Sequence, residues 1–171
     1  AEHLGGGNLT GKLVVMAARQ DPIKRVDLAL EAIRKLRDKG INVSLLVVGQ
    51  KLPPENGIFS METIPHEQMP WIFSASDLVL CPSDYESFGL TVLEACSSGV
   101  PVLVPEQSYW ARIIEVSEAG RVVHGSRWAE AILQLLEDPL QSARSGLAGR
   151  VLSRALSWKR AAKCWDRLIA S

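Results

Sequence analysis

Runs of apolar residues alternate with segments of helical periodicity along most of this chain. Four runs are almost continuously apolar, as parallel strands covered on both faces are: residues 13–18, 43–48, 78–81 and 100–104. Two shorter runs, at residues 58–59 and 121–123, predict further short strands.

Helical spacing marks the segments between these runs. One predicted helix places five apolar residues on one face and ends at Gly40, where a C-terminal cap belongs: Val26, Ala29, Leu30, Ile33 and Leu36. Others are predicted around 69–73, over 90–98, over 128–136 with Pro139 after the end, and from Ser157 onward. The last helix has Trp158 and Trp165 on one face, and we expect them to be core or docking residues and not a sugar-binding set.

This alternation of strands and helices predicts an α/β fold with a doubly wound parallel sheet. Ligands on such sheets bind outside the carboxyl ends of the strands. Chemistry is therefore expected in the strand-to-helix loops.

Composition narrows the function classes. The chain has 171 residues, enough for one domain, and its 19 basic residues balance its 19 acidic ones. No global charge favours nucleic acid or a membrane surface, and no apolar run is long enough to span a bilayer. Cys81, Cys96 and Cys164 form no C-x-x-C pair, and we interpret them as core thiols in a reducing compartment.

The first strand-to-helix loop places two cations at the sheet edge. Arg19 follows the strand and Lys24 precedes the helix, an arrangement that suits a diphosphate. A solvated basic turn explains this local pattern equally well.

The loop after the fourth strand offers a second anion-binding feature. Ser87-Phe88-Gly89 leads to a helix N-terminus, where free N–H groups and the helix dipole favour phosphate. Glu94 interrupts that otherwise apolar helix and needs hydrogen-bond donors. A ribose diol would supply them; a salt bridge to a neighbouring Arg or Lys is at least as consistent with the local sequence.

Other enzyme classes fit less well. Glu86 and Glu94 could form a glycoside hydrolase pair, but they lie on one loop and one short helix of a nucleotide-type sheet. No P-loop, G-x-G-x-x-G, D-x-D or H-x-x-x-H motif is present, so NTPase, nicotinamide and metal sites are not indicated. His66 and His124 are isolated and are interpreted as surface or capping residues.

The run from Pro82 to Ala95, with a Glu, seven residues and a second Glu, resembles the signature of retaining glycosyltransferases of family 4, also called group 1. The Gly99-Val100-Pro101-Val102 segment and the Arg19/Lys24 loop fit the same family. The resemblance implies the C-terminal, Rossmann-like half of a GT-B enzyme over residues 1–171. The active site of that fold lies between two domains, so the resemblance implies that this chain lacks the N-terminal acceptor domain.

The resemblance also implies roles for individual residues. Arg19 and Lys24 would hold the diphosphate of a UDP-, GDP- or ADP-sugar, and Glu86 would lie near the transferred sugar. The segment Phe88, Gly89, Leu90 and Thr91 would bind the same phosphates, Glu94 the ribose and, as a looser match, Ile64 the base. No cofactor or metal is implied.

The chain departs from the family pattern in the loops. Ala18 stands where the family usually has Gly, and Ser60-Met61 stand where a Gly is common. Residues 106–110 contain no glycine, where a Gly-rich turn is usual. These departures concern donor-sugar recognition more than nucleotide binding. We expect the chain to be inactive alone and cytoplasmic, with any peripheral contact to the inner face of a membrane made by the missing half. The alternative is a stand-alone nucleotide-sugar-binding module without catalysis.

Overall fold

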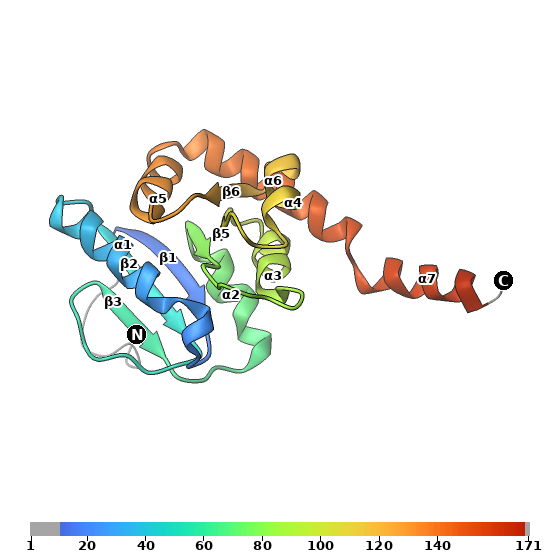
Figure 1. The fold of residues 1–171 in the computed structure, drawn as a ribbon, viewed down its shortest axis with the longest axis horizontal. Helices are drawn as coiled ribbons and strands as arrows, with labels where there is room; N and C mark the ends of the chain where they lie inside the picture. Colours follow the sequence, from blue (N-terminus) through green and yellow to red (C-terminus); the bar gives the residue numbers. More distant parts are fainter. Residues whose placement is uncertain (1–10, 170–171) are drawn as a thin grey trace.

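Six strands pair in parallel in the order β3-β2-β1-β4-β5-β6 (Figure 1). The computed structural model describes residues 11–169. The strands are β1 (Lys12–Ala17), β2 (Val43–Val48), β3 (Ile58–Met61), β4 (Leu78–Leu80), β5 (Val102–Pro105) and β6 (Gly120–Val123). The doubly wound parallel sheet predicted from the apolar runs is therefore confirmed, with all six strands within two residues of their expected positions.

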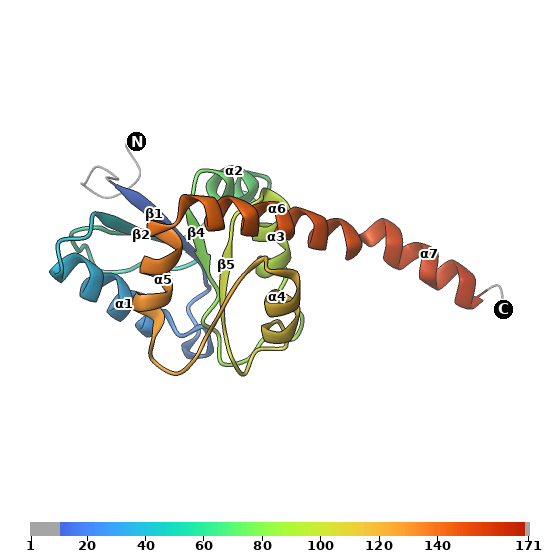
Figure 2. The same ribbon diagram turned by 90° about the horizontal axis from the view of Figure 1, so that it is seen from above.

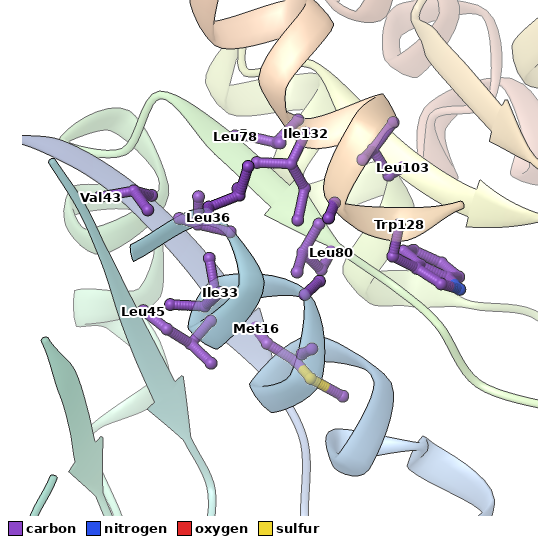
Figure 3. Packing of buried hydrophobic residues seen from close by; sticks show 14 of the residues in the cluster. Met16, Ile33, Leu36, Val43, Leu45, Leu78, Leu80, Leu103, Trp128 and Ile132 are labelled. Carbon is purple, nitrogen blue, oxygen red and sulfur yellow. The ribbon is translucent and has the colours of Figure 1, made fainter. Parts of the chain in front are cut away.

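Helices cover both faces of this sheet. On one face lie α1 (Val26–Asp38) and α5 (Trp128–Glu137), whose apolar sides pack on the strands with Met16, Leu45 and Leu80 (Figure 3). On the other lie α2 (Met69–Ser74), α3 (Leu90–Ser98) and α4 (Ala111–Ser117), around Phe73, Cys96 and Ile114. Short 3₁₀ turns at Pro22–Lys24 and His66–Gln68 precede α1 and α2.

The helix α6 (Pro139–Ala155) was not expected from the apolar pattern. Its buried face consists of small residues, Ser145, Gly146 and Gly149, so it lacks the large apolar residues that mark a helix in sequence. The glycines let α6 approach the end of α3 closely, since a Cβ at Gly146 would collide with the Gly99 carbonyl oxygen. Pro139, taken as a stop signal, is the first residue of α6, where proline is favoured.

The short helix α4 was also missed. Only one of its side chains, Ile114, is fully buried, so seven residues give little periodic signal.

The last helix, α7 (Trp158–Ile169), projects away from the sheet in both views (Figures 1 and 2). Trp158 is 81% exposed and Trp165 65% exposed, so the expectation that they could be core residues is wrong for this chain. A docking role stays a prediction.

The cysteines divide by burial. Cys81 and Cys96 are buried as expected, and burial raises the pKa of the Cys96 thiol to about 12. Cys164, on α7, is exposed, and its interpretation as a core thiol is wrong.

The loops that follow β5 and β6 are joined by a carboxylate. Glu106 accepts from the Nδ1 of His124 at 2.7 Å and from the backbone N–H of Gly125 at 3.0 Å. Hydrogen bonding from His124, followed by that from Gly125, lowers the pKa of Glu106 below its ordinary 4.5. The side chains of Glu106 and His124 are both about half exposed, so His124 is a surface residue as expected.

Replacing Gly146 with Ala should destabilise the protein. In most helices Gly→Ala is favourable, but here the added methyl group has no room against the Gly99 carbonyl. We expect a loss of about 1–3 kcal/mol in the free energy of unfolding, measured by urea denaturation. Leu147→Ala, at an exposed position of the same helix, is the control. A Gly146→Ala protein as stable as the wild type would contradict the close α3–α6 contact.

Glu106→Gln should lower stability at neutral pH but not in acid. Because the folded-state pKa of Glu106 is depressed, its contribution is present above the unfolded value and is lost as the pH falls through the folded value. The stabilities from urea unfolding of both proteins should differ near neutral pH and converge once the pH falls below the folded-state pKa of Glu106. Glu115→Gln, an exposed glutamate on α4, should change stability at neither pH. A deficit of equal size at both pH values would show that the ionised carboxylate is not what stabilises this loop.

Candidate functional site

The sheet brings two distant loops to one edge. β1 and β4 are neighbours at its centre, although the helices that follow them lie on opposite faces. The loop at 18–25 and the loop at 81–89 therefore open side by side at the carboxyl ends of these strands. This is the topological switch point, where α/β sheets bind ligands.

An ion pair joins the two loops at this point. The Nζ of Lys24 lies 2.6 Å from Oε1 of Glu86, and the hydroxyl of Ser83 donates to the same oxygen at 2.8 Å. Both charged side chains are largely sheltered, 18% and 23% exposed. Lys24 is therefore not part of a freely solvated basic turn.

Further contacts brace the same loops. The backbone N–H of Asp84 donates to the carbonyl of Ile23 at 2.9 Å, and Arg25 bonds to the Asp84 carboxylate at 3.0 Å. Arg25 has φ 51° and ψ 47°, a left-handed conformation that is costly for a residue with a side chain. Its guanidinium also binds Asp27, which together with Asp84 raises the pKa of Arg25. Sequence reasoning missed this residue, since nothing local distinguished it from Lys24.

Arg19 behaves differently from Lys24. Its side chain is 76% exposed and bonds to Asp21 at 3.0 Å. The Ile23 N–H and then Arg19 lower the pKa of Asp21, whose carboxylate also caps the 3₁₀ turn. Arg19 thus lies at the expected sheet edge, but it is bound to its own loop.

The segment Phe88 to Thr91 forms the start of α3, as the sequence predicts. Gly89 is the N-cap residue with φ 74°, a conformation that suits glycine. Phe88 and Leu90 are about half exposed, while Gly89 is buried. A helix start leaves its first backbone N–H groups without intrahelical acceptors, so α3 presents donors at the edge that holds Lys24.

Glu94 lies one turn further along α3. Its carboxylate lines a pocket of about 310 Å³ between α2 and α3, together with His66, Met69 and Phe73. The nearest basic partner within the described part of the chain is His66, whose Nε2 is 3.9 Å from Oε1. In residues 11–169 Glu94 forms no salt bridge with Arg or Lys, so that alternative finds no support.

Ile64 lies in the loop between β3 and α2, half buried against the core. His66, two residues later, lines the pocket beside Glu94 and is 82% exposed, a surface position as expected. Within residues 11–169 no three His, Cys, Asp or Glu residues are grouped to hold a metal ion. None of the helices described there has the length and apolar character to cross a bilayer.

The fold has known counterparts among GT-B glycosyltransferases. The structure of a sucrose-phosphate synthase from Thermosynechococcus elongatus superposes with a TM-score of 0.81, at 23% identity over 95% of this chain and 47% of that one. WaaG, a glycosyltransferase involved in lipopolysaccharide biosynthesis, gives a TM-score of 0.71, at 22% identity over 84% of this chain and 42% of its own. These likenesses support the fold.

Sequence relatives point the same way. The D-inositol 3-phosphate glycosyltransferase of Nocardia farcinica is 31% identical over 88% of this chain and 38% of its own length. That of Mycobacterium tuberculosis is 31% identical over 94% of this chain and 36% of its own length. The chain thus spans well under half the length of these relatives.

The model of one family, the glycosyl transferases group 1, matches residues 6–151, which is most of the chain. Together with the double-Glu loop, the parallel sheet and the glycosyltransferase relatives, this match identifies the family. The chain belongs to the glycosyl transferases group 1.

Proposed function

We propose that this chain is the donor-binding half of a retaining glycosyltransferase of family 4 and that it binds a nucleoside diphosphate sugar at the switch point. The observation that carries the proposal is the meeting of Lys24, Glu86 and the start of α3 at one edge of the sheet. A cation and free backbone donors there suit the diphosphate, and a carboxylate beside them suits a sugar hydroxyl.

The chemistry follows from where charge develops. When the bond between sugar and diphosphate breaks, negative charge grows on the phosphate oxygens while the sugar becomes oxocarbenium-like. Lys24 and the N–H groups of α3 would stabilise the departing diphosphate without a metal ion. An ammonium has three donors, so Lys24 can keep its bond to Glu86 and still donate to a phosphate. Arg19 would add a further cation after leaving Asp21.

Glu94 is proposed to accept hydrogen bonds from the ribose. Its carboxylate faces a pocket and, among the described residues, has no Arg or Lys partner to displace. Ile64 and the loop around it would face the base.

We propose that transfer needs a second, N-terminal domain that carries the acceptor site. The relatives are more than twice as long as the segment that this chain matches. The exposed apolar stripe of α7, formed by Trp158, Trp165, Leu168 and Ile169, offers a surface for such a domain. From the relatives we carry over only the reaction class, glycosyl transfer. Residues that recognise their inositol phosphate would lie in the part of those proteins that this chain does not match.

Calorimetry with UDP, GDP and ADP tests donor binding. At least one of these diphosphates should bind more tightly than its own nucleoside, with weak affinity on the order of micromolar to millimolar because the proposed second domain would form the other half of the cleft. Binding should persist in EDTA. Equal affinity for the diphosphate and its nucleoside would refute the proposed phosphate site. Binding that requires magnesium would refute the proposal that no metal ion takes part.

Two substitutions separate the glutamates. Glu94→Gln should weaken the diphosphate and the full sugar nucleotide alike, by about one to two powers of ten, because a hydrogen bond to a charged group is lost. Glu86→Gln should weaken only the full donor. Each variant is a matched control for the other, since both lose one carboxylate charge. A Glu86→Gln protein that loses as much diphosphate affinity as Glu94→Gln would refute this division of roles.

A further inference from the structure

The buried side chain of Trp110 directly contacts the turn that precedes α3. Its indole Nε1 donates to the carbonyl of Phe88 at 2.6 Å, and the Phe88 ring packs edge-on against it at 6.2 Å between centroids. A Cβ added to Gly89 would lie 2.5 Å from the same nitrogen. The indole therefore lies against the backbone of Phe88 and Gly89, although 22 residues separate Trp110 from Phe88.

Trp110 is itself firmly held. It is 1% exposed and lies in the core cluster with Cys96 and Ile114. Its backbone N–H donates to the Ser108 hydroxyl at 3.1 Å, and its carbonyl accepts from Ile114 in the first turn of α4. The indole is therefore fixed on its own side of the contact with Phe88 and Gly89.

The bonded carbonyl belongs to the peptide group that also carries the Gly89 N–H. In a planar trans peptide the C=O and the N–H point in opposite directions. With the Phe88 carbonyl turned toward the buried indole, the Gly89 N–H must point away from it. Because glycine permits many backbone conformations, this peptide has other orientations open to it without such a bond, and a ligand would then have to select one of them at an entropic cost.

We infer that Trp110 is a positioning residue that orients the Gly89 N–H, and with it the start of α3, toward the donor diphosphate. The inference rests on the proposed function, because it assumes that the diphosphate binds at this turn. A core tryptophan also needs an acceptor for its N–H merely to be stable. What distinguishes the positioning role is an effect on phosphate affinity beyond any effect on folding.

Trp110→Phe tests the role, since it keeps an aromatic ring and removes the donor. The variant should bind the nucleoside diphosphate about three- to tenfold more weakly than the wild type, the loss expected for one hydrogen bond, while affinity for the nucleoside is unchanged. Trp128→Phe is the matched control: Trp128 is 2% exposed in the cluster on the other face of the sheet, and its substitution should leave both affinities unchanged. UDP, GDP and ADP, with their nucleosides, are the probes.

A second readout does not need a ligand. The amide resonance of Gly89 in a ¹⁵N spectrum should shift or broaden in Trp110→Phe and stay unchanged in Trp128→Phe. Unchanged diphosphate affinity in Trp110→Phe, or an equal loss for nucleoside and diphosphate, overturns the positioning role. If the wild type binds no diphosphate, the proposed function fails, and the Gly89 resonance alone decides whether Trp110 orients this peptide; an unaltered resonance overturns the inference.

Discussion

The pairing of β1 with β4 is the contact on which the candidate site depends. The two strands are far apart in sequence, and each feeds a loop whose helix lies on the opposite face of the sheet. Parallel pairing aligns their carboxyl ends, so the loops at 18–25 and 81–89 must open at the same edge. The ion pair of Lys24 with Glu86 and the backbone bond between Asp84 and Ile23 follow from this alignment. A shift in the pairing would separate both contacts together.

Hydrogen bonds from residues that follow several different strands hold the loops at the carboxyl edge of the sheet. Arg25 ties the loop after β1 to Asp84, and Trp110 anchors the Phe88 peptide from the loop after β5. Gln50, after β2, donates to the Ala18 carbonyl at 3.0 Å. Residues that follow β1, β2 and β5 thus restrain the two loops of the site: Gln50 holds the loop at 18–25, and Arg25 and Trp110 hold the loop at 81–89. Such restraint is what a site for a small anionic ligand requires, because every backbone donor fixed beforehand is one that the ligand need not order.

Much of the fold was predictable because large apolar residues carry the signal. The strands and the helices α1, α3 and α5 bury such residues, and their positions were expected closely. The helix α6 is not predicted, because Gly146 and Gly149 pack by close approach of the backbone and so leave no periodic pattern of apolar residues. The exposure of Cys164 and Trp158 was missed because an amphipathic pattern shows that a face is apolar, and not what covers it.

For the candidate site too, the sequence predicts some features and not others. Motif spacing predicts a site at Lys24, Glu86 and the start of α3, but not that the lysine and the glutamate touch, since no local pattern encodes a contact across 62 residues. Arg25 and Trp110 are missed for a related reason: Arg25 binds the Asp84 carboxylate and Trp110 the Phe88 carbonyl, contacts between segments that a local motif does not record. Their roles depend on the left-handed backbone of Arg25 and on the buried position of Trp110.

The charges at this edge are already paired, and this bears on the half-site interpretation. Lys24 is bound to Glu86, Arg19 to Asp21 and Arg25 to Asp27 and Asp84. A diphosphate carries several negative charges, whereas Lys24 and Arg19 are each already paired with one carboxylate, and the start of α3 adds a partial charge of only about +0.5. Lys24 can donate to a phosphate while it stays bonded to Glu86, but its charge is already offset by that carboxylate, so further cations would favour diphosphate binding. A second domain closing over this edge would supply such cations and exclude water, which strengthens every remaining charge interaction. The paired state of the edge therefore suits a surface that is completed by another part of the protein.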